Sequence, residues 1–174
     1  MAIEIRAFGG DPDELAAFIT RNWRIHYAKD GYAPTVKGDF FRWMMPTFAN
    51  GDPGSIIAAY DGTKLVGVMP SEPTDVTLMG SPARIHWTEY TTVDSERQRS
   101  GIGRSLRDGL QVRSNEIGVC LRSGFVNSPL MTGKGRQFWT SMGDRSVLVR
   151  HPRPWVRILD GGAVAAGVHD AVTR

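Results

Sequence analysis

The sequence has one cysteine, Cys120, among its 174 residues. A single cysteine cannot form an intramolecular disulfide, and this scarcity favours a reducing, cytoplasmic setting. Apolar runs fall well short of the ~20 residues that a membrane-spanning helix needs. The first residues, Met1 to Arg6, lack the layout of a signal peptide. We therefore expect a cytoplasmic protein that has no membrane partner.

Several ligand-binding motifs are missing as well. No His or Cys residues stand at the spacing of a metal site, so we expect no metal. The Gly-x-x-x-x-Gly-Lys-Ser/Thr pattern of Walker nucleotide sites does not occur. The pair Gly101-x-Gly103 lacks a third glycine three residues later, where Leu106 stands. This argues against a dinucleotide-binding turn.

Composition and length suit one soluble globular domain spanning residues 1–174. Hydrophobic residues make up 41% and charged residues 22% of the chain, which is ordinary for a protein with a packed core. The sequence contains no internal repeat, low-complexity segment or linker that would divide it.

Charge is distributed unevenly along the chain, although the net charge is only +3. Up to Glu96 there are 8 basic and 13 acidic residues, and from Arg97 onward there are 13 basic and 5 acidic residues. A basic second half favours an anionic ligand, either a cofactor with several phosphate groups or a polyanion. Because no basic recognition helix or RNA-binding signature occurs, the sequence argues against nucleic acid, and a polyanion binder stays an alternative.

Hydrophobic periodicity predicts alternating helices and strands. Asp11 or Asp13 is expected to cap the first helix. Pro70 and Pro73 are expected to interrupt or end a strand, which resumes across a bulge. The predicted strands are 4–8, 55–60, 65–69, 75–79, 83–93, 119–121, 146–150 and 155–159, and the predicted helices are 14–27, 37–48, 102–117, 137–142 and 163–172.

Aromatic and methionine side chains recur along the two N-terminal helices, 14–27 and 37–48. Such a stripe is most often core, because packing is the default use of these residues. The alternative is that the two helices form one wall of an acceptor pocket.

One stretch, from Val93 to Leu106, connects a predicted strand to a predicted helix through a polar turn. The first N–H groups of a helix lack intrahelical partners, and the helix dipole adds partial positive charge there. Small residues let an anion approach these groups closely. The stretch therefore predicts a pyrophosphate cradle, the alternative being an ordinary turn without a ligand. Its residues are Gln98, Arg99, Ser100, Gly101, Ile102, Gly103 and Arg104.

Written as Gln98-x-x-Gly101-x-Gly103, this stretch resembles the acyl-CoA loop of the GNAT superfamily of N-acyltransferases. The resemblance covers roughly residues 55–150. It implies an α/β fold with a mixed, mostly antiparallel central sheet and helices on both faces. Acetyl-CoA would lie between two splayed strands, its pantetheine arm pairing with strand backbone. The cofactor-binding residues that the resemblance implies are Thr91, Thr92, Val93, Gln98, Arg99, Ser100, Gly101, Ile102, Gly103, Arg104, Ser105 and Asn127.

Glu89 is the candidate catalytic residue. A lysine-like amine has a pKa of ~10.4, so acyl transfer to it needs a base. Alternation along 85–93 puts five residues on one face: Ile85, Trp87, Glu89, Thr91 and Val93. Several GNAT enzymes have a glutamate at the corresponding place, where it serves as the base. The alternative is a solvated residue or a structural ion pair. His86, on the other face, is expected to pack.

The C-terminal part departs from the resemblance. GNAT chains often carry a Phe-Tyr-x-x-x-Gly-Phe segment whose tyrosine can protonate the departing CoA sulfur. Here Trp139 stands in place of that tyrosine and Asp144 in place of the final phenylalanine. An indole N–H donates a hydrogen bond but is not a useful acid. This leaves open a non-catalytic domain that only binds or senses acyl-CoA.

The function that the resemblance implies is transfer of an acetyl group from acetyl-CoA to a primary amine. The acceptor could be a small molecule, an antibiotic, a peptide or a protein. Acyl chain length and oligomeric state, including a homodimer, stay open.

Overall fold

The computed structural model describes residues 2–27 and 35–124. By its internal contacts the chain divides into two compact units, Met1–Val126 and Asn127–Arg174, and the described residues lie in the first. The predictions for Asn127, Trp139, Asp144 and the C-terminal helices and strands fall outside the described residues. The expectation of a single domain over 1–174 stays a prediction.

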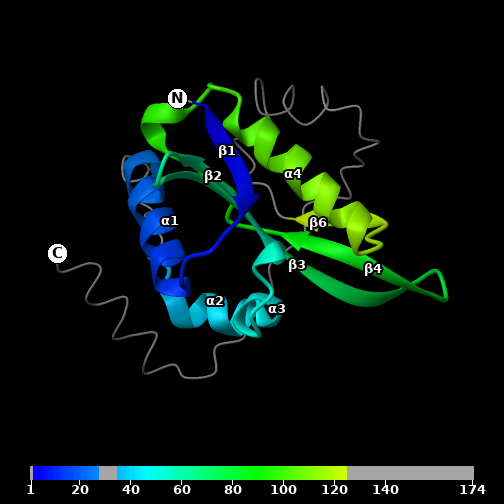
Figure 1. Cartoon of the computed structure of the whole chain (residues 1–174). Helices are drawn as coiled ribbons and strands as arrows, with labels where there is room; N and C mark the ends of the chain where they lie inside the picture. Colours follow the sequence, from blue (N-terminus) through cyan, green and yellow to red (C-terminus); the bar gives the residue numbers. More distant parts are fainter. Residues whose placement is uncertain (1, 28–34, 125–174) are drawn as a thin grey trace, which may run out of the picture. The chain divides into compact units, whose positions relative to one another are not determined.

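Helices and strands alternate along the described chain (Figure 1). In chain order they are β1 Ile3–Ala7, α1 Pro12–Tyr27, α2 Gly38–Met44, α3 Pro46–Ala49, the short 3-10 helix Pro53–Ser55, β2 Ile56–Asp61, β3 Lys64–Leu78, β4 Ser81–Thr88, β5 Thr92–Val93, the 3-10 helix Ser95–Arg97, α4 Ile102–Glu116 and β6 Leu121–Gly124.

The strands form one sheet in the order β1-β2-β3-β4-β6, with β5 also pairing with β3. All these pairs are antiparallel except β4 with β6. The pairing of β4 with β6 ends at Thr88 and Gly124, and no described strand pairs with β5 on that side. The expected mixed, mostly antiparallel and open sheet is confirmed.

Helices cover both faces of this sheet, as expected. Figure 1 shows α1 and α2 on one side and α4 on the other. Alternation in β2 supplies both cores: Ile56, Ala58 and Tyr60 pack toward α1 and α2. Ile57 and Ala59 pack toward α4. Strands buried on both faces read as near-continuous apolar runs, as β2 does.

The first helix starts where the sequence predicts. The side-chain oxygen Oδ1 of Asp11 accepts hydrogen bonds from the backbone N–H groups of Asp13 and Glu14, both at 2.8 Å. Pro12 follows the cap, and its missing N–H would have had no partner at that position. Asp11, rather than Asp13, is therefore the cap.

The second predicted helix, 37–48, is in fact two helices. α2 ends at Met44, and α3 begins at Pro46. A proline inside a helix lacks the N–H for the i−4 bond, and its ring clashes with the preceding turn. Pro46 therefore starts a new helix instead of continuing the old one.

The expectation that Pro70 and Pro73 interrupt their strand is wrong. β3 runs unbroken for 15 residues through both prolines. Pro70 lies opposite Ile56, the first residue of β2, and beyond it β3 pairs only with β4. Proline is tolerated in such an edge segment, where the lost N–H need not join a second ladder.

The expected long strand 83–93 is also wrong, because a β-bulge divides it into β4 and β5. Ser71 lies opposite Thr88, and Val68 lies opposite Thr92. Two residues of β3 thus face three residues, 89–91, of the other strand. Within this bulge Tyr90 has a φ of 54°, in the left-handed region that L-residues rarely adopt.

α4 is anchored to β4 by a buried polar contact. The ring nitrogen Nδ1 of His86 lies 2.9 Å from Ser114 Oγ, and the Ser114 hydroxyl donates to the carbonyl of Leu110. Because that hydroxyl proton is used, His86 Nδ1–H is the donor to Ser114. Burial lowers the pKa of His86 to about 4, and the charges of Arg122 and Arg113 add to the effect. The expectation that His86 packs is confirmed.

Candidate functional site

Two hydrogen bonds hold the turn between β5 and α4 at its β5 end. Asp94 Oδ1 accepts from the backbone N–H of Glu96 at 3.0 Å and so caps the short 3-10 helix. Asn22, buried on α1, accepts from the backbone N–H of Ser95 at 3.0 Å through its Oδ1. The loop 98–104 therefore follows a backbone segment that these hydrogen bonds hold in place.

At the start of α4, backbone N–H groups have no acceptor within the described part of the chain. Arg99 and Gly101 have φ angles of 65° and 89°, and Gly101 is the N-cap without a side-chain cap. None of the N–H groups of residues 98–103 donates to an acceptor among residues 2–27 and 35–124. A Cβ at Gly101 would meet no atom within 4 Å, so the position is open. Open N–H groups at a helix N-terminus form an anion-binding geometry.

Two arginines beside these donors are available to an anion. Arg99 and Arg104 are exposed and form no ion pair among the described residues. Arg97 is engaged instead, because its Nη2 lies 2.5 Å from Asp61 Oδ2. Gln98, the first residue of the motif, reaches to His26 on α1, with Nε2 atoms 2.5 Å apart.

Two serines of the predicted cradle bond to the loop's own backbone. Ser100 Oγ donates to the carbonyl of Arg97 at 2.5 Å, and Ser105 Oγ donates to the carbonyl of Gly101 at 3.5 Å. Ile102 is buried against the sheet and starts the apolar face of α4. Gly103 is partly buried in the first turn of the helix. The seven predicted cradle residues thus lie together, with Ile102 inward.

Glu89 lies at the first position of the bulge. Its backbone N–H donates to the Pro70 carbonyl at 3.3 Å, and its Oε1 accepts from the Trp87 indole at 2.7 Å. The side chain is partly buried and forms no ion pair among the described residues.

The expected common face of Glu89, Thr91 and Val93 does not exist. Val93 packs into the core beneath α4, whereas Thr92 bonds the α1 residue Trp23 on the opposite side. Thr91 is exposed. The additional residue in the bulge reverses the alternation after Thr88, as a shift by one residue must.

Hydrogen bonds and rings hold the bulge in place. Thr92 Oγ1 donates to the Tyr90 carbonyl at 2.8 Å and accepts from the Trp23 indole at 2.8 Å. The Tyr90 ring stacks on Trp23, with centroids 5.2 Å apart, and meets Phe40 and Phe41 of α2 edge-on. Phe18 and Phe41 of the N-terminal helices are thus core residues, and Trp23 and Phe40 pack against the bulge, whereas Trp43 is exposed.

Glu72 is a site residue that sequence reasoning missed. It lies opposite Trp87 in the β3–β4 register, on the face that carries Glu89. Its Oε1 accepts from the backbone N–H of Thr47 at 3.0 Å and from the Thr47 hydroxyl. Its Oε2 is buried and has no partner among the described residues. Burial raises the pKa of Glu72. The signal in the sequence was a lone acidic residue between Pro70 and Pro73.

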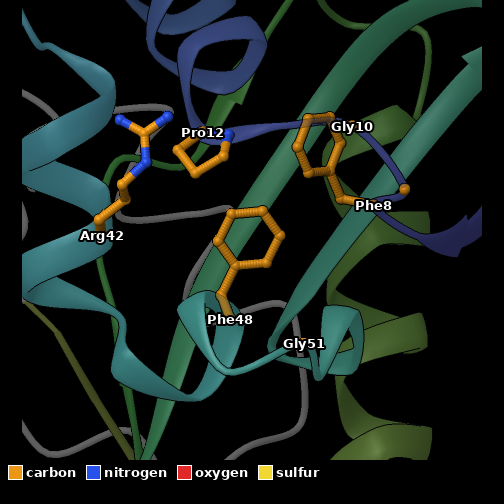
Figure 2. Close-up of a pocket in the computed structure, with 7 residues that line it drawn as sticks. Phe8, Gly10, Pro12, Arg42, Phe48 and Gly51 are labelled. Atoms are coloured by element: carbon orange, nitrogen blue, oxygen red, sulfur yellow. The ribbon is translucent and has the colours of Figure 1, made fainter.

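A separate hollow of about 440 Å³ lies near the start of α1 (Figure 2). The Phe8 and Phe48 rings line it, with centroids 6.0 Å apart, and so does Arg42. Arg42 is already paired with Asp13 and Asp39. No residue of β4, β5 or the loop 98–104 lines this hollow. It does not contribute to the site at the bulge.

Two further searches of the described residues gave negative results. No group of three or more His, Cys, Asp or Glu side chains there could hold a metal ion. No helix among them has the length and apolar character needed to cross a membrane.

Comparison with known proteins gives one family match. Residues 2–69 match the family model for the acetyltransferase (GNAT) domain. The match ends before the loop 98–104, so the assignment of that loop rests on its motif and geometry. No curated protein matches the sequence.

Solved structures share the fold at low sequence identity. An aminoglycoside acetyltransferase from an uncultured soil metagenomic sample has a TM-score of 0.60 and 14% identity, covering 90% of this chain and 100% of that one. Glucosamine-6-phosphate N-acetyltransferase from Arabidopsis thaliana has a TM-score of 0.58 and 14% identity, covering 88% and 100%. A transcriptional regulator from Bacillus halodurans C-125 has a TM-score of 0.64 and 18% identity, covering 90% and 100%.

Proposed function

We propose that this chain, which has the GNAT fold and a GNAT acetyltransferase family match, transfers an acetyl group from acetyl-CoA to a primary amine. One observation carries the proposal. A bulge that holds a carboxylate, Glu89, is followed directly by β5, one side of which pairs with no described strand, and by N–H groups at the start of α4 that have no described acceptor.

Acetyl-CoA would use both features. Its diphosphate would bind the N–H groups of residues 98–103, with Arg99 and Arg104 adding charge. Its pantetheine amides would pair with backbone of Thr91, Thr92 and Val93, as an added strand does. Asn127 and Ser105 are retained as further proposed contacts, although Asn127 lies outside the described residues.

Glu89 would act as the base. It would take a proton from the acceptor ammonium, so that the neutral nitrogen can attack the thioester carbonyl carbon. A C–N bond forms, the C–S bond breaks, and the sulfur leaves as thiolate. The nitrogen, which is positively charged after the attack, loses its second proton, and this proton neutralises the thiolate. Because a thiolate is a good leaving group, the step does not depend on the tyrosine that Trp139 replaces.

Two structural neighbours are named for amino-sugar acceptors, which supports a small-molecule amine as the acceptor. The alternative of a non-catalytic acyl-CoA-binding domain is favoured by Trp139.

Glu89→Gln tests the catalytic role. Glutamine keeps an oxygen for the Trp87 indole but cannot accept the proton. We expect unchanged acetyl-CoA affinity and a loss of acyl transfer of ~10²-fold or more near neutral pH. The loss should shrink at high pH, where neutral amine is abundant. Release of free thiol over an amine panel measures the rate.

The matched control is Glu116→Gln, which removes one negative charge from an exposed position at the end of α4. It should turn over like the parent. Equal rates for the Glu89 variant and the parent across pH would remove Glu89 from the mechanism. Absence of turnover with every amine, together with tight acetyl-CoA binding, would favour the non-catalytic alternative.

A further inference from the structure

We propose that Glu72 binds a second ammonium group of the acceptor, so that the preferred acceptor is a diamine or polyamine. This inference rests on the proposed function and assigns Glu72 a positioning role in the same site. The reacting nitrogen lies at Glu89, and a second, protonated nitrogen lies at Glu72.

The first observation is an incompletely bonded carboxyl group. Glu72 is only 9% exposed, and both hydrogen bonds from Thr47 go to its Oε1 atom. Its Oε2 atom is buried and has no donor among the described residues. A buried polar atom without a partner is costly, so native proteins rarely keep one without a use.

The second observation concerns charge. No described lysine, arginine or histidine forms an ion pair with Glu72, and the charge of another acid, Asp52, acts on it. A buried carboxylate normally has a cationic partner. An ammonium group of a ligand would supply the missing hydrogen bond and the missing charge together.

The third observation is the position of Glu72 relative to Glu89. Glu72 lies opposite Trp87, and the Trp87 indole donates to Glu89 on the same face of the sheet. In a regular antiparallel pair the backbone positions of diagonal neighbours lie roughly 7–8 Å apart, and Glu89 stands two residues after Trp87, at the first position of the bulge. Two carboxylates on adjacent strands and on one face suit two nitrogens of one small molecule.

A monoamine has a nitrogen for Glu89 but no second nitrogen for Glu72. Proton transfer to Glu89 neutralises the reacting nitrogen, and the charge of Glu72 then has no partner. The two acids thus favour a ligand that keeps a positive charge while it reacts.

The test compares putrescine with n-butylamine, which has the same carbon chain and one amino group. With the full-length parent we expect kcat/KM for putrescine to exceed that for n-butylamine at least tenfold. In Glu72→Gln this preference should disappear through a higher KM for putrescine, with kcat little changed. Glutamine retains an acceptor for both Thr47 donors. Glu116→Gln, a matched loss of one charge at an exposed position, should keep the parent's preference.

Three results decide the proposal. Equal kcat/KM for the two amines in the parent would overturn it, whether or not the variant folds. A preference for putrescine that survives in a folded Glu72→Gln protein would also overturn it. If no amine is acetylated, the proposed function fails, and calorimetry with putrescine tests the Glu72 site separately. Putrescine binding by the parent that is lost in Glu72→Gln supports the Glu72 site. If the parent does not bind putrescine, or Glu72→Gln binds it equally well, the Glu72 proposal is overturned too.

Discussion

At the scale of single residues, the burial of His86 makes the stability of the fold depend on pH. Its ring is fully buried, and Nδ1–H donates to Ser114 on α4, so the neutral form is the one the fold accommodates. The unfolded chain takes up a proton near the ordinary pKa of 6.5, whereas the folded protein takes it up only near 4. Between these values the unfolded state binds more protons, and stability therefore falls as the pH falls.

We expect the free energy of unfolding to decrease by about 2 kcal/mol from pH 7 to pH 5 because of His86. Urea unfolding of the parent and of His86→Gln at both pH values measures it. The difference in pH dependence between the two proteins gives the contribution of His86 alone. This comparison is needed because Glu72 makes stability change with pH in the opposite direction. Burial raises the pKa of Glu72, so its contribution is lost as the pH rises. The same pH dependence in parent and variant would contradict the account.

Some residue roles could be predicted from sequence and others could not. Asp11 was among the predicted caps because aspartate before a helix has a known use. Gly101 was predicted at a turn, and it does adopt a positive φ. Glu72 was missed because nothing local indicates that its strand residue will be enclosed by Thr47, 25 positions earlier in the chain. Roles that depend on distant contacts cannot be read from local patterns.

At the scale of elements, close approach of α4 to the sheet depends on Gly109. A Cβ there would come within 2.9 Å of Ile5 and 3.0 Å of Ile57, which belong to β1 and β2. In a packed core these two branched side chains cannot both move away to make room for the Cβ atom. The small residue thus sets the distance between helix and sheet, and with it the position of the loop at the helix start.

Gly109→Ala should therefore destabilise the protein by about 1–3 kcal/mol, the usual cost of overpacking, although alanine is the better helix former. Chemical denaturation measures the change. Gln111→Ala, at an exposed position two residues along the same helix, is the control and should be nearly neutral. A Gly109→Ala protein as stable as the parent would show that α4 does not need the close approach.

Hydrophobic periodicity predicts some boundaries of helices and strands and fails at others. Hydrophobic periodicity predicted a helix over 102–117, and the buried residues of α4, Ile102, Leu106 and Leu110, do follow one helical period. The bulge at 89–91 could not be predicted, because it arises from the register between β3 and its partners. The same register explains why Pro70 does not end β3. The strands that pair with β3 determine both the bulge and the continuation of β3 through Pro70. The local sequence does not show which strands those are.

At the scale of the whole molecule, the fold class was predicted from one short motif in its setting. The strand, polar turn, glycines and helix around Gly101 implied a mostly antiparallel sheet with helices on both faces, and the structure has both. The acceptor could not be predicted, because the proposed acceptor contacts, Glu72 on β3 and Glu89 in the bulge, are brought together only by strand pairing. The central claim is that the start of α4 binds the diphosphate of acetyl-CoA.

Calorimetry with acetyl-CoA and with S-acetylpantetheine, which lacks the nucleotide and its phosphates, tests that claim most directly. The parent should bind acetyl-CoA at least tenfold more tightly, a difference of ~1.4 kcal/mol. Gly101→Glu places a carboxylate and a strained side chain at the donors and should abolish this preference. The control Gly80→Glu changes a glycine of similar φ, equally open, at the tip of the β3–β4 hairpin, and should bind like the parent. Equal affinity of the parent for both compounds, or an unchanged preference in a folded Gly101→Glu protein, would contradict the account.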